Sequence, residues 1–196
     1  MVVGIFGGSF NPIHTGHAIL ASYIRDAKIV DKVWFAVSPQ NPLKHNQNSA
    51  SFKDRVEMCK LLTSSSTRLC VCDIENELQP PYYTINTLNE LKKRYPGDKF
   101  KLIIGSDNLQ IFHKWKDYKT IIDNFGLIVY PRRGYEYDKC IDLYHEENII
   151  LLDAPIIEIS STDIRAGIAD GKDMQYYIPD RVYEYIKRHE LYCSNG

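Results

Sequence analysis

Short apolar runs alternate with amphipathic stretches along almost the whole chain, and this alternation limits the fold more than any other feature. A short apolar run predicts a buried strand, whereas apolar residues at intervals of three and four predict a helix. We expect strands at 2–6, 32–37, 68–72, 100–104, 125–130 and 149–152, and helices at 15–28, 52–63, 83–95, 162–169 and 180–189. This alternation is typical of an α/β fold with a mostly parallel sheet. Ligands of such sheets bind beyond the carboxyl ends of the strands, so the residues after each strand are the first candidates.

Length and composition favour a single domain over residues 1–196, with a helical portion from about residue 160. The 196 residues contain no internal repeat and no linker rich in Pro, Gly or Ser. Lys and Arg number 24 against 25 Asp and Glu, so the chain lacks the basic excess of a general nucleic-acid binder. The first apolar run is too short for a signal peptide or a membrane span. Because the five cysteines form no CxxC pair, we expect buried, reduced thiols. Together with the balanced charge and the short first run, this predicts a cytoplasmic location with no membrane or nucleic-acid partner.

The first candidate site lies at the end of the first predicted strand, in the segment from Gly7 to His17. Gly7 and Gly8 allow the backbone to turn tightly there and to approach a ligand. His14 and His17 lie three residues apart at the start of the next predicted helix, so both can face one point, and a helix N-terminus attracts phosphate. These features predict phosphate binding, with a metal pair or two surface histidines as the alternatives. The glycines match neither G-x-G-x-x-G nor a P-loop, so they do not indicate a dinucleotide-cofactor site.

A second candidate site, Ile159-Ser160-Ser161-Thr162-Asp163-Ile164-Arg165, leads into the helix predicted near the C-terminus. Ser160 and Thr162 are residue types that cap helices, which places free backbone N–H groups at this helix start. Because helical side chains tilt toward the N-terminus, Arg165 can reach back over the same helix end. Hydroxyl, N–H and guanidinium groups then converge on one anion. A capped surface helix with an exposed arginine is the alternative.

These two segments resemble the motifs of a known superfamily. The run Ser9-Phe10-Asn11-Pro12-Ile13-His14-Thr15-Gly16-His17 resembles the [ST]-F-[DN]-P-x-H-x-G-H signature of the nucleotidyltransferases that carry the HxGH motif. Residues 159–165 resemble the I-S-x-T-x-x-R motif that this superfamily uses to bind ATP phosphates. The resemblance implies a Rossmann-like open parallel sheet flanked by helices, with a small C-terminal helical part. It also implies transfer of a nucleotidyl group from ATP or CTP to a phosphorylated acceptor.

Further segments narrow the resemblance to the bacterial nicotinate-nucleotide adenylyltransferases. Residues 81–88 resemble their P-S-Y-T-x-x-T-L segment, although Tyr82 stands where the family often has Ser. Residues 104–107 resemble their I-G-x-D turn, 112–116 their F-x-x-W segment, and 127–135 their basic strand end. The matches run from residue 4 to about residue 165, so the resemblance covers most of the chain.

The resemblance implies a role for each candidate residue. His14 and His17 would be catalytic. The ATP-binding residues would be Gly7, Gly8, Ser9, Phe10, Gly105, Asp107, Ser160, Thr162 and Arg165, and the mononucleotide-binding residues would be Lys44, Tyr83, Thr84, Trp115, Lys116 and Arg132. The pattern leaves open whether Lys44 or His45, and whether Arg132 or Arg133, contacts the acceptor. The structural alternatives are core positions for Tyr83 and Trp115 and, for Asp107, the cap of a helix from residue 108.

The implied reaction joins ATP and nicotinate mononucleotide into nicotinate adenine dinucleotide (deamido-NAD), with release of pyrophosphate, in NAD biosynthesis. Mg²⁺ would be bound mainly through the ATP phosphates and water, so no protein metal ligand is expected. The rival interpretations are the same chemistry on nicotinamide mononucleotide or phosphopantetheine, and a non-catalytic nucleotide sensor. The intact His14, His17 and Arg165 argue against the sensor. The sequence does not determine the oligomeric state, and a homo-oligomer is one of the possibilities.

Overall fold

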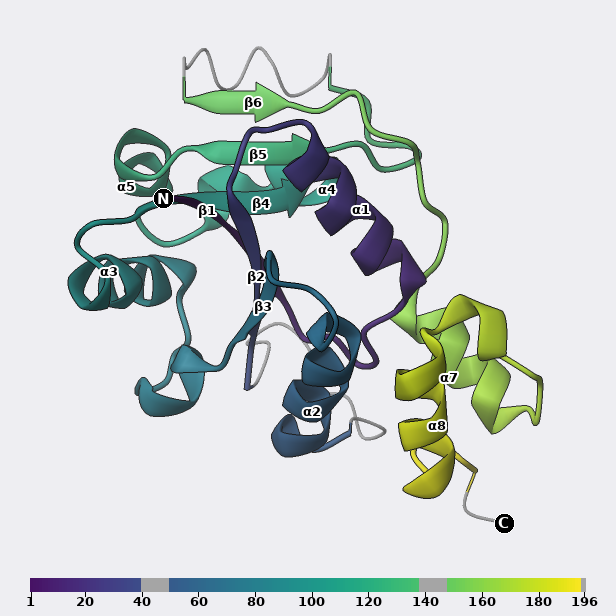
Figure 1. Ribbon diagram of the computed structural model, residues 1–196. Coiled ribbons are helices and arrows are strands. Elements are labelled where there is room, and N and C mark those ends of the chain that lie inside the picture. Colours follow the sequence, from purple (N-terminus) through teal and green to yellow (C-terminus); the bar gives the residue numbers. More distant parts are fainter. Residues whose placement is uncertain (40–49, 138–147, 195–196) are drawn as a thin grey trace.

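The computed structural model (Figure 1) describes residues 1–39, 50–137 and 148–194. Within these residues, six parallel strands form one sheet in the order β3-β2-β1-β4-β5-β6. The strands are β1 (Val2–Gly8), β2 (Lys32–Val37), β3 (Leu69–Cys72), β4 (Lys99–Gly105), β5 (Leu127–Tyr130) and β6 (Ile149–Leu151). The chain builds outward from β1 to β3 and then returns to place β4 on the other side of β1. The carboxyl ends of β1 and β4 therefore flank the switch point at which sheets of this kind bind ligands.

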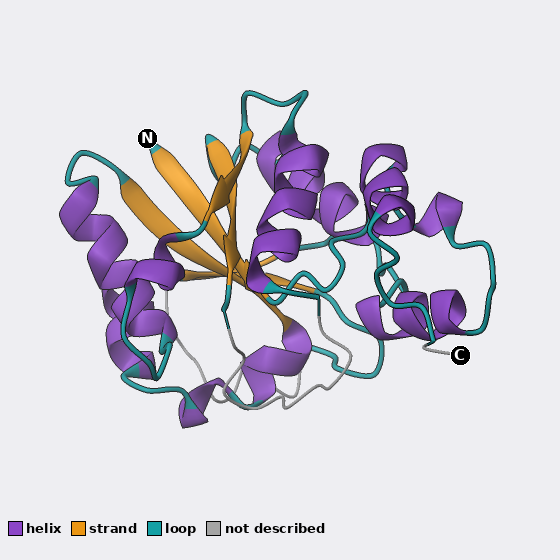
Figure 2. Ribbon diagram, turned by 90° about the horizontal axis from the view of Figure 1, so that it is seen from below, coloured by secondary structure: helices purple, strands orange, loops and turns teal. Residues whose placement is uncertain are grey.

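Helices cover both faces of the sheet (Figure 2). On one face lie α1 (Thr15–Asp26) and α2 (Phe52–Thr63), whose buried residues share a core with those of α7 (Ser161–Ala169) and α8 (Asp180–Arg188). The other face is covered by α3 (Thr84–Arg94), α4 (Ser106–Gln110) and α5 (Tyr118–Asn124). Short 3-10 helices occur at η1 (Ile74–Glu77), η2 (Phe112–Lys114) and η3 (Gln175–Tyr177). None of the described helices combines the length and the apolar composition that crossing a membrane requires.

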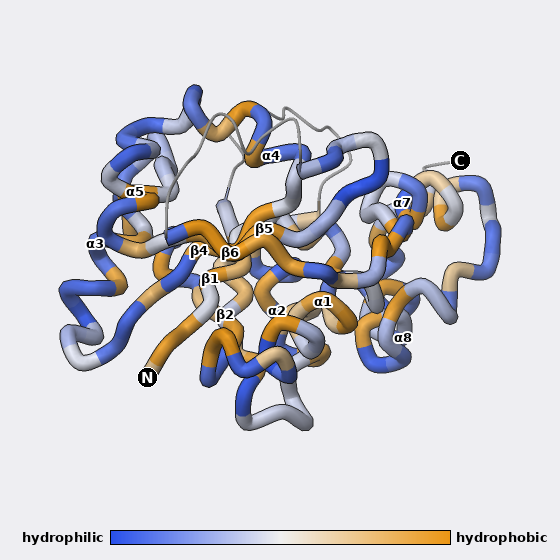
Figure 3. The backbone as a smooth tube through the Cα atoms, turned by 90° about the horizontal axis from the view of Figure 1, so that it is seen from above, coloured by the Kyte–Doolittle hydropathy of each residue, from blue (hydrophilic) through white to orange (hydrophobic). Residues whose placement is uncertain are grey.

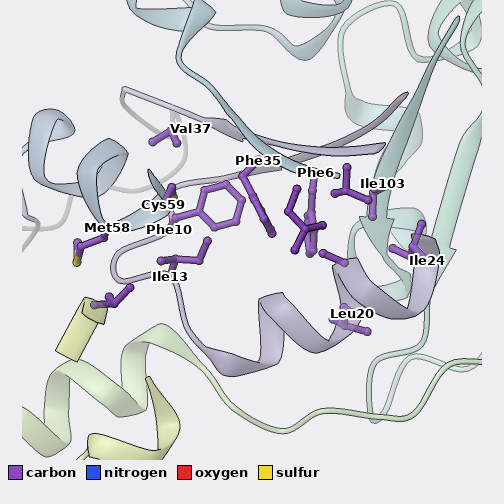
Figure 4. Packing of buried hydrophobic residues seen from close by; sticks show 14 of the residues in the cluster. Phe6, Phe10, Ile13, Leu20, Ile24, Phe35, Val37, Met58, Cys59 and Ile103 are labelled. Carbon is purple, nitrogen blue, oxygen red and sulfur yellow. The ribbon is translucent and has the colours of Figure 1, made fainter. Parts of the chain in front are cut away.

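Alternating side chains of the strands supply two hydrophobic cores, one on each face. In β2, Val33, Phe35 and Val37 belong to the core under α1 and α2, whereas Trp34 and Ala36 pack into the core under α3 to α5. This period of two is expected for a strand that is covered on both faces. Figure 3 shows the apolar strands at the centre with hydrophilic segments around them. Figure 4 shows the aromatic and aliphatic side chains of the first core packed between the sheet and α1.

The α/β class and the Rossmann-like parallel sheet expected from the sequence are confirmed, and each expected strand and helix has a counterpart. Several boundaries differ by one or two residues, and two of these differences have a clear physical reason. The first strand does not end at residue 6, because Gly7 and Gly8 remain paired with β2. The fifth strand begins at Leu127 and not at residue 125. Phe125 is instead the C-cap of α5, and Gly126 makes the turn between α5 and β5 with a left-handed φ of 75°.

Candidate active site

Two histidines lie stacked at the start of α1, just beyond the carboxyl end of β1. His14 is the N-cap of the helix. Its ring centroid lies 3.7 Å from that of His17, and the two ring planes differ by 30°. The backbone N–H of His14 donates a hydrogen bond to His17 Nδ1 over 3.2 Å. Because Nδ1 accepts, this bond assigns the proton of a neutral His17 ring to Nε2, which becomes a donor of fixed orientation.

Burial favours the neutral form of both imidazoles. It lowers the pKa of His14 from the ordinary value of 6.5 to about 4, and the charge of Arg132 adds to the effect. The pKa of His17 is also held well below its ordinary value, first by burial and then by His14 and Arg132. His14 Nδ1 is buried without a hydrogen-bond partner among the described residues. Since an unpaired buried nitrogen is costly, the pair suits a ligand that supplies hydrogen-bonding groups of its own.

An aromatic side chain fixes the position of His17. Phe10 meets the imidazole edge-on, at a centroid distance of 5.1 Å. It can lie there because Gly8 has no Cβ, which would be 2.9 Å from the Phe10 ring. Phe10 is only 2% exposed, so its side chain belongs to the core and only its backbone is left for contact with a ligand. Gly7 and Ser9 flank Gly8 at the carboxyl end of β1.

The start of α7 packs against the loop between β1 and α1 (Figure 1). Ser160 is the N-cap of α7, and its hydroxyl accepts a backbone N–H of the first turn. The hydroxyl of Ser161 donates to a carbonyl oxygen of the loop over 2.9 Å. Arg165 reaches back over the helix start, where Nη1 donates to the carbonyl of Asn11 over 2.6 Å and Nη2 donates to Thr162 Oγ1 over 3.4 Å. The two predicted phosphate-binding segments are therefore neighbours in the fold.

Asn11 connects segments that lie far apart in the sequence. Its side-chain Oδ1 accepts a hydrogen bond from the backbone N–H of Ala50 over 3.0 Å and another from the hydroxyl of Tyr192 over 2.8 Å. Its carbonyl accepts from Arg165. Asn11 is only 3% exposed, and a buried amide oxygen needs partners of this kind. The loop that leads to the histidines is thereby tied to the start of α2, to α7 and to the C-terminal segment.

Gly105, Asp107 and Arg132 form a compact cluster at the carboxyl ends of β4 and β5. Gly105 is the N-cap of α4, so Asp107 lies within that helix and does not cap one from residue 108. A Cβ on Gly105 would lie 2.3 Å from Asp107 Oδ1, so a side chain there would displace the carboxylate. Arg132 Nε lies 3.7 Å from the same oxygen. Both atoms are buried without a hydrogen-bond partner among the described residues, which suits a polar ligand.

Of the two adjacent arginines after β5, Arg132 faces the histidines. Its backbone N–H donates to Ser106 Oγ over 2.9 Å, and its guanidinium donates to the hydroxyl of Tyr130 over 3.1 Å. Its charge contributes to the low pKa of both histidines. Arg133 is exposed and forms an ion pair with Glu158 at 2.9 Å. The geometry therefore favours Arg132 as the arginine that borders the site.

Four of the expected acceptor residues, Tyr83, Thr84, Trp115 and Lys116, lie at the start of α3 and directly after η2. Tyr83 is the N-cap of α3, and Thr84 is the first residue of the helix. The ammonium of Lys116 lies 4.9 Å from the centre of the Tyr83 ring, so the two segments face each other. Tyr83 is 37% exposed and is not a core residue. Trp115 is half-buried and packs against Phe112 at a centroid distance of 5.0 Å, which leaves part of the indole open to a ligand.

Known proteins supply a family for this arrangement. Residues 5–167 match the family model described as cytidylyltransferase-like. The probable nicotinate-nucleotide adenylyltransferase of Flavobacterium johnsoniae is 41% identical over 192 residues, which cover 98% of this chain and 99% of that protein. The protein of the same name from Bacteroides fragilis is 43% identical over 183 residues, which cover 93% of this chain and 90% of that protein. The chain belongs to the nicotinate-nucleotide adenylyltransferase family.

Solved structures share the fold of this family member. Plasmodium falciparum nicotinic acid mononucleotide adenylyltransferase complexed with NaAD matches it with a TM-score of 0.80 at 22% identity, over 97% of each chain. The same protein complexed with APC matches with a TM-score of 0.78 at 21% identity, over 97% of this chain and 96% of that one. At these identities the likeness establishes the Rossmann-like fold alone.

For this nicotinate-nucleotide adenylyltransferase-family chain, the structure does not test whether Lys44 or His45 contacts the acceptor. Lys44 and His45 lie outside the described residues. The residues on either side of the undescribed segment are Pro39 and Ala50, and both accept hydrogen bonds from the side chain of Arg55. The choice between the lysine and the histidine therefore rests on the sequence alone.

The candidates selected from the sequence do not include two charged residues that are buried in the structure, Arg55 in α2 and Glu75 in η1. Glu75 Oε1 accepts a hydrogen bond from the hydroxyl of Thr87 over 2.8 Å, and burial raises the pKa of the carboxyl group. Glu75 thereby joins η1 to α3, the helix that begins at Thr84. Neither burial has a local sequence signal, because tertiary contacts decide whether a charged side chain is covered.

The site of this family member is rich in groups that bind phosphate. Within residues 1–39, 50–137 and 148–194, no three His, Cys, Asp or Glu side chains lie together in a way that could hold a metal ion. The polar groups around the histidine pair are imidazoles, hydroxyls, guanidinium groups and helix-start N–H groups. Such groups bind phosphate oxygens, whereas Mg²⁺ prefers oxygen ligands.

Proposed function

We propose that this chain transfers the adenylyl group of ATP to nicotinate mononucleotide, which gives nicotinate adenine dinucleotide and pyrophosphate in NAD biosynthesis. The observation that carries the proposal is the stacked histidine pair beside the start of α7. The names of the relatives supply the substrates, since both are probable nicotinate-nucleotide adenylyltransferases. An oxygen of the acceptor 5′-phosphate attacks the α-phosphorus of ATP. The bond from that phosphorus to the oxygen of the β-phosphate breaks, and pyrophosphate leaves with the electron pair.

On the ATP side, the histidines stabilise charge. Negative charge grows on the non-bridging oxygens of the α-phosphate during the attack, and His17 Nε2–H donates to one of them. His14 binds a neighbouring phosphate oxygen. Ser160, Thr162 and Arg165 hold the β- and γ-phosphates, because a guanidinium and the free N–H groups of a helix start both favour anions. No covalent enzyme intermediate is needed, so the contribution of the chain is alignment and charge stabilisation.

The rest of ATP is held by groups at the carboxyl ends of β1 and β4. The backbone of residues 7–10 borders the phosphates. Asp107 Oδ1, which is buried and has no hydrogen-bond partner within the described part of the chain, accepts hydrogen bonds from ribose hydroxyls. Gly105 leaves the space that this carboxylate occupies.

On the acceptor side, the exposed part of Trp115 stacks on the pyridine ring. The hydroxyl of Thr84, the N–H groups at the start of α3 and the backbone N–H of Lys116 meet the carboxylate of nicotinate. Tyr83 borders the same pocket. Arg132, whose charge acts on both histidines, binds the acceptor phosphate, for which a guanidinium fork is well suited.

Mg²⁺ would be held mainly by the phosphate oxygens of ATP and by water, and would neutralise part of the charge of the triphosphate. The partners that we propose are therefore ATP, nicotinate mononucleotide and this cation, without nucleic acid or membrane. The described cysteines are free thiols, which suits a reducing, cytoplasmic compartment.

The proposal is tested by pyrophosphate release from ATP with three acceptors in parallel, nicotinate mononucleotide, nicotinamide mononucleotide and phosphopantetheine. We expect the highest kcat/KM with nicotinate mononucleotide and a dinucleotide product identified by mass spectrometry. ATP binding without pyrophosphate release for any acceptor would indicate a nucleotide sensor. A preference for phosphopantetheine would move the chain to a different acceptor class.

A further inference from the structure

A buried arginine holds the ends of two neighbouring strands together at the carboxyl edge of the sheet. Arg55 lies near the start of α2 and is only 3% exposed. Its Nη1 donates to the carbonyl oxygens of Ser9 and Ser38, each over 2.7 Å. Nη2 donates to the carbonyl of Pro39 over 2.8 Å, and Nε donates to that of Ala50 over 3.3 Å. One guanidinium therefore satisfies four backbone carbonyl groups from three segments.

These carbonyl groups belong to both halves of the site. Ser9 follows β1 and begins the loop of residues 9–14, here named the ATP-side loop, which leads to the histidines. Ser38 and Pro39 follow β2 and are here named the acceptor-side end, because Lys44, an expected mononucleotide-binding residue, follows them in the sequence. Nη1 bridges the two directly, since it donates to one carbonyl of each. Arg55 itself lies behind both segments, in the helix that covers this face of the sheet.

The chemistry of Arg55 differs from that of a surface arginine. All of its hydrogen bonds named above go to carbonyl oxygens, so its donors fix backbone positions. Burial lowers the pKa of the guanidinium, which reflects the cost of removing the charge from water. The ring of Phe52 lies 5.5 Å from the guanidinium carbon and supports the group from one side. A planar fork with five N–H donors can bond to several carbonyls at once, whereas an ammonium group cannot reproduce that geometry.

We infer that Arg55 is a positioning residue that sets the distance between the ATP-side loop and the acceptor-side end. This inference rests on the proposed function, because it concerns the alignment of two substrates. Each substrate alone needs only its own segment, but the reaction needs the acceptor phosphate in line with the α-phosphorus. A misplacement of about 1 Å in such a geometry can cost about 100-fold in rate. Loss of Arg55 should therefore separate turnover from binding.

The test compares Arg55→Lys with Arg181→Lys, a matched control on α8 whose exposed guanidinium donates to Ser64 Oγ at the other end of α2. The measurements are kcat by pyrophosphate release and the Kd of each substrate alone by calorimetry, both well below the melting temperature. We expect Arg55→Lys to lower kcat about 10-fold or more, and to change each Kd less than about threefold. The control should match the wild type in all three values. An unchanged kcat in a variant that only melts earlier would reduce Arg55 to a stability residue and overturn the inference.

A second variant and a second readout cover the case in which Arg55→Lys does not stay folded. Phe52→Leu removes the ring under the guanidinium but keeps the N–H donors of Arg55. It should lower kcat about 2–5-fold and leave the Kd of each substrate nearly unchanged. A wild-type kcat in this variant would contradict the inference. Hydrogen exchange at residues 7–12 and 33–39 reports on the two segments without any turnover, and should rise in both together. If the wild type released no pyrophosphate, the proposed function would fail, while exchange would still decide the role of Arg55.

Discussion

His14 and His17 are uncharged near pH 7, so the positive charge that a triphosphate needs comes from other residues. Arg132, at the end of β5, acts on both histidines through its charge, and Arg165 reaches from α7 to the loop that leads to them. This separation has a catalytic use. A guanidinium binds phosphate charge that is already present in the ground state, whereas a neutral N–H donor gains most when charge grows in the transition state.

Replacement of His17 by alanine should therefore affect turnover more than binding. We expect His17→Ala to lower kcat by about 10²–10³, the usual effect of removing one donor to a developing charge. The Kd of ATP should change much less. Steady-state kinetics and calorimetry check the two values, with His189→Ala at the end of α8 as the control. A folded His17→Ala protein with a near-normal kcat would remove His17 from its proposed role.

Replacement of His14 should make the protein less sensitive to acid. With a pKa lowered from 6.5 to about 4 in the folded protein, only the unfolded chain binds this proton between those pH values. Stability that is present above pH 6.5 is thus lost as the pH falls toward 4, by up to about 3 kcal/mol from this residue. We expect His14→Gln to lose less unfolding free energy than the wild type between about pH 7 and about pH 4.5 in urea titrations. Identical losses in the two proteins would contradict the neutral state of His14.

At the scale of elements, helix starts bring the functional groups together. The histidines begin α1, Arg165 reaches over the start of α7, and Thr84 begins α3. The start of α7 is readable from its capping serine, whereas α1 and α3 have His14 and Tyr83 as N-caps and are predicted from their apolar periods. The short helix α5 was not expected, since its N-cap is Asp117 in a left-handed conformation, which is not a usual capping pattern.

The residues that hold those elements in place could not be predicted from the sequence. Arg55 lies within an amphipathic stretch where a charged residue is normally assigned to the solvent face, and Glu75 lies among other acidic residues. Their burial depends on carbonyl and hydroxyl groups that come from other parts of the chain, such as Ser9 and Thr87. The motif residues could therefore be predicted, whereas the groups that position them could not.

A substitution at the start of α7 should impair the use of ATP and leave the use of the mononucleotide unchanged. The planar guanidinium of Arg165 donates to Asn11 and to Thr162, and we propose that it also binds the ATP phosphates. Arg165→Lys keeps the positive charge but loses this planar arrangement of donors. We expect kcat/KM for ATP to fall by about 10–150-fold, the range for one lost charge-assisted hydrogen bond. The KM for the mononucleotide should stay close to that of the wild type. The opposite pattern, measured by varying each substrate in turn, would assign Arg165 to the acceptor half.

The start of α3 should control the choice of acceptor. Donors that expect a carboxylate are poorly paired when an amide arrives, so nicotinate mononucleotide should exceed nicotinamide mononucleotide in kcat/KM by about 10-fold or more. Thr84→Val removes a hydroxyl at little change in volume and should narrow this gap. Trp115→Ala should impair both acceptors, because stacking does not distinguish them. Equal kcat/KM for the two mononucleotides in the wild type would refute the acid preference and leave adenylyl transfer intact.

At the scale of the whole molecule, we propose that the chain folds as one unit. Buried residues of α7 and α8, Ile164, Val182 and Ile186, belong to the same core as Phe10 and Ile13 near the N-terminus. Without them, the apolar surface behind the ATP-side loop would face water.

Removal of α7 and α8 should therefore unfold the rest of the chain. We expect a protein that ends at residue 159 to show no cooperative thermal transition by near-UV circular dichroism. A chain that ends at Ser194 retains every described residue and serves as the control. A cooperative transition of the shorter chain near the wild-type melting temperature would show that the helical portion is a separate unit.

The hydrogen bond between Asn11 and Tyr192 also has a consequence for biosynthesis. Its partners are 181 residues apart in the sequence, and a ribosome needs roughly 10–40 s to make that length of chain. For this interval the N-terminal loop is already made but lacks the hydroxyl that completes its hydrogen bonding. ATP binding to chains stalled on ribosomes should therefore appear only when the stall point leaves Tyr192 outside the exit tunnel. A nascent chain would then withhold its nucleotide site from the ATP of the cell until Tyr192 has left the ribosome.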